Sequence, residues 1–119
     1  MIITPKRIYE TPAAADGYRV LVDRLWPRGF TKEKAALDEW AKELAPSNDL
    51  RRWFHADRTK WKEFERKYLA ELAEHHDLAR QLLVNAGRKR LTLLYASNDT
   101  ERNHALVLAE YLKKLAAGK

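Results

Sequence analysis

The chain has 119 residues, 45% of them hydrophobic and 34% charged, and it is predicted to fold as a single globular domain, 1–119. It contains no cysteine, which excludes disulfides, thiolate metal sites, iron–sulfur clusters and cysteine nucleophiles. The formal net charge of +6 favours anionic partners, although acidic residues interleave with most of the basic ones along the chain.

The first predicted elements are two strands. Residues 2–9 form a short strand with three isoleucines as its apolar positions. After a loop of small residues, residues 18–23 form a second strand whose centre, Val20–Val22, is continuously apolar. Such continuity is typical of a strand that is buried on both faces, as in a parallel sheet.

The loop that follows the second strand is the most distinctive stretch of the sequence. It reads Asp-Arg-Leu-Trp-Pro-Arg-Gly over residues 23–29, so two arginines and a carboxylate stand where the chain leaves the sheet. Loops after the strands of an α/β sheet commonly face a ligand, and guanidinium groups match phosphate and carboxylate oxygens in pairs. We therefore predict that Arg24 and Arg28 bind an anion.

Three other residues of this loop have two interpretations each. Asp23 is a candidate for acid–base catalysis or for orienting the arginines; alternatively, it holds the turn by pairing with an arginine or accepting backbone N–H groups. Trp26 either stacks on a planar ligand or covers the core. Gly29 supplies a positive φ, or room for a close approach to the backbone.

The next segment is less definite. Thr31 is expected to cap a short helix over 32–36. Residues 37–45 are rich in Ala, Glu and Lys, which favours helix, but a strand here would bring the following Pro-Ser loop to the same edge of the sheet. The choice between helix and strand stays open on composition alone.

Ser47 is predicted to cap the next helix, which would turn Leu50, Trp53 and Phe54 inward. Ser47 is also a candidate ligand-binding residue because its loop follows the ambiguous segment. The flanking Lys42 and Arg51 either add positive charge to the site or are two solvated side chains.

Two amphipathic helices and a further strand are expected between residues 58 and 96. The first helix covers 58–74, and the second covers 77–86 and ends at Gly87, a typical C-terminal cap. Residues 91–96 form a buried strand. The inward faces of the two helices are expected to carry Trp61, Phe64, Tyr68, Leu69, Leu72, Leu78, Leu82 and Leu83.

A last helix is predicted over 100–115, after a polar loop. Asp99 or Thr100 is expected to cap it, with Asn103 and His104 in its first turns. The free N–H groups at a helix start can bind an anion, so Asp99 and Asn103 are assigned to the ligand site. His104 is a candidate general base, with helix packing as the alternative.

Strands that alternate with helices predict an α/β fold, a small three-layer arrangement with a mostly parallel sheet of about four strands flanked by helices. Loops after parallel strands lie along one edge of the sheet. The loops at 24–29, 46–47 and 97–103 are therefore expected to meet in one cleft, and this convergence is the main basis of the predicted anion site.

Several common sites are missing from the sequence. No glycine-rich nucleotide loop of the Gly-x-Gly-x-x-Gly or Gly-x-x-x-x-Gly-Lys-Ser/Thr type is present, and the four histidines show no ligand spacing. We therefore expect no cofactor and no metal. No run approaches the ~18 apolar residues of a membrane span, and the first residues lack a signal-peptide pattern, so a cytoplasmic protein without membrane contact is expected.

At the segments described above, the chain resembles the YeaO-like branch of the domain-of-unknown-function family 488. The matching stretches cover nearly the whole chain, and the longest lie at 19–29 and 93–105. The resemblance implies a small cytoplasmic α/β protein without an established activity, and it favours a strand over 37–45. A cysteine that the wider family carries in the loop at 96–103 is absent here, so thiol chemistry does not carry over.

The function predicted from these features is binding of a small anionic ligand, bearing phosphate or carboxylate, at the carboxyl edge of the sheet, with catalysis left open. Two alternatives remain. One is a nucleic-acid-binding or regulatory module that uses the basic surface, which is not favoured because the charges are scattered. The other is a homodimeric interaction protein that uses exposed aromatic residues such as Trp40 or Trp53.

Overall fold

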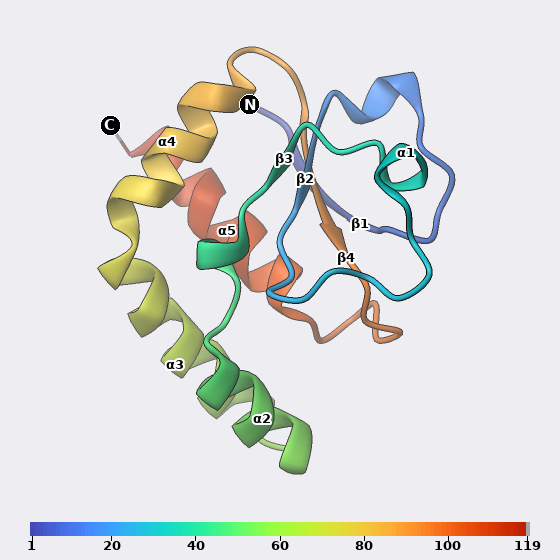
Figure 1. Cartoon of the computed structure of the whole chain (residues 1–119). Coiled ribbons are helices and arrows are strands. Elements are labelled where there is room, and N and C mark those ends of the chain that lie inside the picture. The colour runs from blue at the N-terminus through green and yellow to red at the C-terminus, as the bar shows by residue number, and fades with distance from the viewer. Residues whose placement is uncertain (119) are drawn as a thin grey trace.

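The structure, a computed structural model, describes residues 1–118 and is built around a four-stranded sheet in which neighbouring strands are parallel (Figure 1). The spatial order is β1-β4-β2-β3. The predicted α/β fold with a mostly parallel sheet is confirmed. The strands are β1 (Ile3–Arg7), β2 (Tyr18–Leu21), β3 (Glu39–Trp40) and β4 (Leu91–Tyr95).

The two central strands are the most apolar. All five residues of β4 are buried, and Val20 and Leu21 of β2 have no exposed surface. Both faces of a central strand are covered, which accounts for the continuous apolar runs. The edge strand β1 instead carries Lys6 and Arg7, and the other edge strand, β3, has only two residues, as expected where a strand meets water on one side.

Helices cover the two faces of the sheet unequally. The four longer helices enclose the larger hydrophobic cluster on one face, whereas the one-turn helix α1 (Lys32–Ala35) and its flanking loops cover a small cluster on the other (Figure 1). Within residues 1–118, no helix is both long and apolar enough to cross a membrane. The longer helices are α2 (Asn48–Ala56), α3 (Trp61–Glu74), α4 (His76–Ala86) and α5 (His104–Ala117).

The segment left open between helix and strand contains short pieces of both. Glu39 and Trp40 form β3, paired with Val20 and Leu21 of β2, and a 3₁₀ turn over Lys42–Leu44 follows. The preference for strand is therefore correct for two residues only. Pairing with a buried neighbour overrides the helical propensity of the surrounding alanines and lysines.

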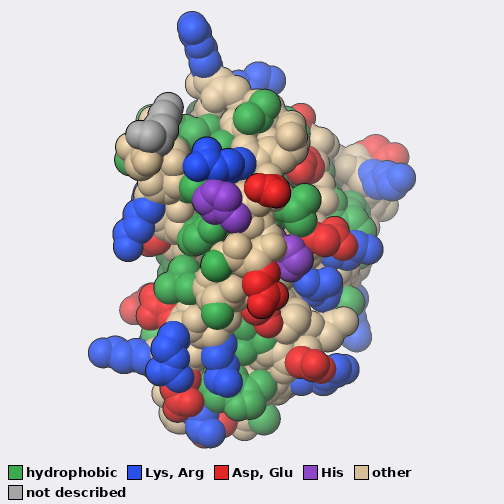
Figure 2. Space-filling model, turned by 90° about the vertical axis from the view of Figure 1, so that its left-hand side faces the viewer, with side chains coloured by type: hydrophobic (Ala, Val, Ile, Leu, Met, Phe, Trp, Pro, Cys, Tyr) green, Lys and Arg blue, Asp and Glu red, His purple; other side chains and the backbone are tan. Residues whose placement is uncertain are grey.

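The outer surfaces of the helices are mixed in character. Figure 2 shows Lys and Arg side chains interspersed with Asp, Glu and apolar ones on the face that α3 and α4 form. Leu69 and Leu78, which were predicted to face inward, are exposed on this surface. Their neighbours Tyr68 and Ala79 are fully buried instead, so the inward stripe of each helix is narrower than the apolar pattern suggests.

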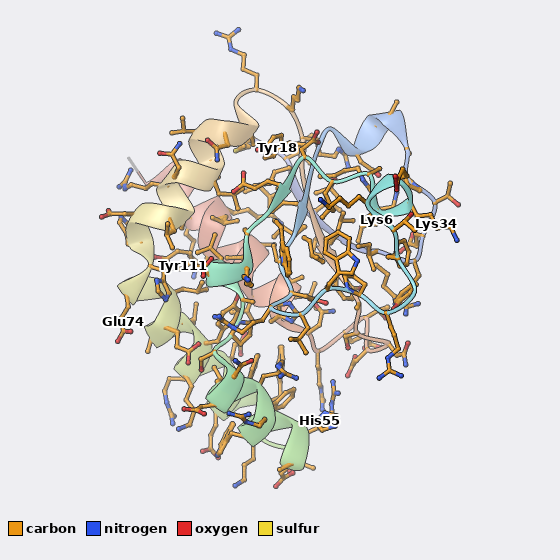
Figure 3. All side chains as sticks on the ribbon, in the orientation of Figure 1. Lys6, Tyr18, Lys34, His55, Glu74 and Tyr111 are labelled. Carbon is orange, nitrogen blue, oxygen red and sulfur yellow. The ribbon has the colours of Figure 1, made fainter. Side chains whose placement is uncertain are left out.

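A buried polar cluster holds the start of β2. Arg19 donates to the Asp16 carboxylate and to two backbone carbonyls at the end of α1, at 2.8 and 3.0 Å. Lys6, labelled in Figure 3, reaches the same carboxylate at 2.9 Å. Thr92 donates to the Asp16 backbone carbonyl at 2.6 Å. We call Lys6, Asp16, Arg19 and Thr92 the closed cluster because each of its charges has a partner of opposite sign.

Candidate functional site

A pocket of about 590 Å³ opens at the carboxyl ends of the central strands. Its lining comes mainly from the loop after β2 (23–28), from α2 with the turn after it (51–58), and from the loop after β4 with the start of α5 (96–104). These segments meet because parallel strands bring their carboxyl ends to one edge of the sheet. The loop at 46–47 contributes only Pro46.

Asp23 joins three segments at this edge. One carboxylate oxygen, Oδ2, accepts the backbone N–H of Ala96 at 3.0 Å, and the other, Oδ1, lies 2.8 Å from Nε2 of His104. The Asp23 backbone carbonyl accepts from the indole N–H of Trp40 at 2.7 Å. These contacts tie the end of β2 to β4, α5 and β3, so Asp23 holds the turn through backbone groups, which was the structural alternative for this residue.

His104 is fixed by the same end of β2. Its Nε2 lies 3.0 Å from the carbonyl oxygen of Val22, which can only accept a hydrogen bond, so Nε2 carries a proton. That N–H is directed at Val22 rather than at Asp23, so Asp23 Oδ1 is buried in close contact with the ring but without a well-directed hydrogen bond. The two residues predicted to be catalytic are therefore adjacent, and both are anchored to the backbone.

Guanidinium groups outnumber carboxylates in the pocket. The most firmly held is that of Arg24, which donates to the backbone carbonyls of Pro46 and Ala45 at 3.1 and 3.3 Å. The other four arginines are exposed, so most of their donors face solvent. The five arginines and two aspartates that line the pocket are Arg24, Arg28, Arg51, Arg58 and Arg102, with Asp23 and Asp99.

Asp99 shapes the loop after β4. Its Oδ1 accepts the backbone N–H groups of Glu101 and Arg102 at 2.9 and 3.0 Å, and these bonds hold the pKa of the carboxyl below its usual value. Its Oδ2 lies 3.7 Å from Arg58, whose guanidinium also stands over the ring of Phe54 at 5.2 Å. The arginine is thus placed at the pocket by a weak ion pair and an aromatic face.

The cap of the last helix differs from the prediction. The helix begins at His104 rather than at residue 100, and its cap is Asn103, whose side chain accepts the N–H of Leu106 at 3.1 Å. The expectation that Asp99 or Thr100 caps α5 is wrong, because Asp99 is engaged by the tight turn that precedes the helix. Asn103 also donates to the Asp99 carbonyl at 2.9 Å, which fastens that turn to the helix.

Three predicted ligand-binding residues lie outside the pocket. Ser47 caps α2, accepting the N–H of Leu50 at 3.1 Å, and donates to Glu71 at 2.6 Å. Lys42 stands 4.9 Å from the ring of Trp40. Gly29 follows the pocket-lining part of its loop and takes a positive φ of 77°, the first of its two predicted roles. The other predicted residues, Trp26 included, line the pocket.

Sequence reasoning missed Arg58 and Arg102. Each was placed inside a predicted helix, whereas α3 and α5 begin three and four residues later, at Trp61 and His104. Both arginines therefore lie in loops beside the pocket. His55, at the end of α2 (Figure 3), is a further lining residue that the sequence did not single out. Within residues 1–118, no group of three or more His, Asp or Glu side chains could hold a metal ion.

Comparison with known proteins identified relatives over nearly the full length. A family model described as the inactive DUF488-N3 subclade matches residues 2–119. The uncharacterized protein YeaO of Escherichia coli (strain K12) is 50% identical over 115 residues, covering 97% of this chain and 100% of its own length. The uncharacterized protein Rv3073c of Mycobacterium tuberculosis is 41% identical over 106 residues, 89% of each chain. No solved structure showed significant similarity.

Proposed function

Since this chain belongs to the inactive DUF488-N3 subclade of domain-of-unknown-function family 488, we propose that it acts by binding a small anionic ligand, bearing phosphate or carboxylate, at the carboxyl edge of its sheet. The observation that supports this proposal is the charge of one pocket, in which five arginines stand against two carboxylates. Guanidinium groups recognise phosphate and carboxylate oxygens in pairs, so the pocket offers donors of the right kind.

The two carboxylates offset only part of this positive charge. Asp23 and Asp99 each accept backbone N–H groups, so part of their negative charge is already balanced locally. Four of the arginines keep most of their donors toward solvent. An entering anion would find hydrogen-bond donors without first breaking a strong ion pair, because the one pair within residues 1–118 that involves a pocket arginine and a pocket carboxylate, Arg58 with Asp99, is long at 3.7 Å.

The contacts of the Asp23–His104 pair favour an anchoring role over general-base catalysis at Nε2. A general base needs an unprotonated ring nitrogen, whereas Nε2 of His104 carries a proton toward the Val22 carbonyl, so only Nδ1 could accept a proton from a substrate. In this proposal both residues hold the end of β2 in place. The description of the subclade as inactive agrees with that role.

The segregation of charge also favours a pocket ligand over a nucleic acid spread across the surface. On the helical face, basic and acidic side chains alternate (Figure 2). A protein that binds a nucleic acid along its surface normally gathers basic residues into a patch or stripe. The pocket at the edge of the sheet concentrates guanidinium groups instead.

Two adjacent arginines on α2 provide a matched test. Arg51 lines the pocket, whereas Arg52 is exposed outside it and pairs with Asp49. Calorimetric titration with inorganic phosphate should show binding by the wild type and a loss of about tenfold in affinity for Arg51→Met, because a charge-assisted hydrogen bond contributes roughly 1.5–3 kcal/mol. Arg52→Met should bind as the wild type does.

Three outcomes would contradict the proposal. Equal losses in Arg51→Met and Arg52→Met would mean that phosphate responds only to net charge. No binding of phosphate or of a dicarboxylate such as malonate by the wild type would remove the anion site. Hydrolysis of a bound phosphate ester by the wild type, abolished in His104→Gln, would overturn the binding-only role.

A further inference from the structure

The pocket is larger than a single oxyanion requires. Its volume of about 590 Å³ lies within the range of roughly 300–1,000 Å³ that small organic ligands occupy. The arginines come from three segments around this volume, the loop after β2, α2 with its following turn, and the loop after β4. A lone tetrahedral anion would leave much of the volume and some of the guanidinium groups without contact.

The charge of the lining limits the charge of the occupant. Counting only the arginines and the carboxylates of the lining, five guanidinium groups stand against two carboxylates, so an occupant carrying about three negative charges would neutralise them. A phosphate monoester carries about −1.5 to −2 near neutral pH and would leave positive charge unbalanced. A second phosphoryl group supplies the missing charge, so the lining fits a diphosphate ester better than a monophosphate.

Two large apolar residues of the pocket lining are exposed. Leu25 and Tyr9 are 58% and 46% exposed, although both are large apolar side chains. The Tyr9 ring is held from the side by an edge contact with Phe30 at 5.1 Å. Apolar side chains that stay exposed next to guanidinium groups suit a ligand with a charged end and a flat apolar end.

We propose, on the basis of the anion-binding function above, that the ligand is a diphosphate ester of a molecule with a planar ring, the chemistry of a nucleoside diphosphate. The diphosphate lies among Arg51, Arg58 and Arg102, where three exposed guanidinium groups face the pocket. The ring lies against Leu25 and Tyr9. Asp99 keeps the loop of Arg102 in place through its backbone contacts.

Calorimetric titration with four probes tests this assignment: inorganic phosphate, pyrophosphate, adenosine and ADP, each without added metal. Wild-type protein should bind pyrophosphate at least tenfold more tightly than phosphate, and ADP at least threefold more tightly than pyrophosphate, whereas adenosine alone binds weakly or not at all. Arg58→Met should weaken pyrophosphate and ADP by similar factors. Leu25→Ser should weaken ADP alone, to about the affinity of pyrophosphate.

The results that would contradict this assignment can be distinguished from those that would contradict the anion-binding function. If pyrophosphate and phosphate bind equally, or if ADP binds no better than pyrophosphate and Leu25→Ser has no effect, this assignment is wrong while the anion-binding function stands. If none of the anions binds, the diphosphate-ester assignment and the anion-binding function are both wrong. If a 5′-phosphorylated oligonucleotide binds a hundredfold more tightly than ADP, the pocket holds the end of a nucleic-acid strand instead. Because Leu25 and Arg58 are exposed, both variants should fold, and circular dichroism checks this.

Discussion

The strand β2 carries an aspartate and an arginine at each end, and the two pairs behave differently. At its start, Arg19 and Asp16 are buried in the closed cluster, and Arg19 also donates to two backbone carbonyls. At its end, Asp23 pairs with His104 rather than with an arginine, and Arg24 donates to two backbone carbonyls. The same residue types therefore form the buried closed cluster at one end of β2 and an open, positively charged pocket at the other end.

The difference lies in the balance between donors and acceptors. A buried charge is tolerated only where partners replace the water it has lost, and the closed cluster provides them. In the pocket, cations exceed anions and stay hydrated, so they cost the fold little and remain available to a ligand. We infer that the start of β2 contributes mainly to stability and its end mainly to binding.

The largest expected difference between the two ends of β2 is in the free energy of unfolding when one arginine at each end is replaced. Arg19→Met leaves two carbonyls without their donor and weakens the pairing of Asp16, so the free energy of unfolding should fall by about 3–5 kcal/mol. Arg28→Met, at the exposed loop beyond the other end, should change it by less than about 0.5 kcal/mol. Urea denaturation followed by circular dichroism measures both. Similar losses in the two variants would remove the distinction.

Two glycines, one before β2 and one after it, allow the two ends of the strand to be compared by the cost of adding a Cβ to the backbone. Gly17 and Gly29 both have positive φ, 69° and 77°. A Cβ at Gly17 would overlap the Arg90 carbonyl oxygen, whereas a Cβ at Gly29 would meet nothing within 4 Å among the described residues. Gly17→Ala should therefore cost about 3 kcal/mol or more, from strain and steric overlap together, and Gly29→Ala only about 1–2 kcal/mol.

Thermal and urea unfolding of the two alanine variants provide the measurement. A loss for Gly29→Ala as large as that for Gly17→Ala would show that the pocket loop is as tightly constrained as the start of β2. Phosphate binding by Gly29→Ala is a useful second readout, because a loop that only passes the pocket should leave the affinity unchanged.

Much of the fold could be predicted from the sequence because its signals are local. The apolar runs of β2 and β4 and the Ser47 cap of α2 follow from neighbouring residues alone. The convergence of the loops followed from the parallel topology. The start of α5 could not be predicted, because Asp99 and Asn103 are both good caps and only the turn that engages Asp99 decides between them.

Long-range contacts account for the remaining differences. Arg19 has one local partner, Asp16, but its burial also depends on the backbone carbonyls of Ala35 and Ala36 at the end of α1, which are distant in the sequence. The strand β3 exists because Glu39 and Trp40 pair with β2, against the helical propensity of their neighbours. Arg58 and Arg102 became visible as pocket residues only once the true starts of α3 and α5 were known.

The smallest expected effect is a change in the stability of the protein at low pH. Burial alone would raise the pKa of Asp16, but Lys6, the Ala13 backbone N–H and Arg19 outweigh it and hold the pKa below its ordinary value of 3.8. Because the folded state thus binds the proton more weakly than the unfolded state, Asp16 contributes stability above pH 4, and this contribution is lost as the pH falls below 4 through the lowered pKa. The wild type should therefore lose more stability than Asp16→Asn between pH 5 and 2.

Asp99 provides the matched control at the other end of the sheet. Backbone N–H groups lower its pKa too, but its loop is exposed, so water already screens the carboxylate. Asp99→Asn should consequently follow the wild type closely over the same pH range in urea denaturation. If Asp16→Asn also followed the wild type, the charge of Asp16 would not stabilise the closed cluster, and the two ends of β2 would differ in burial alone.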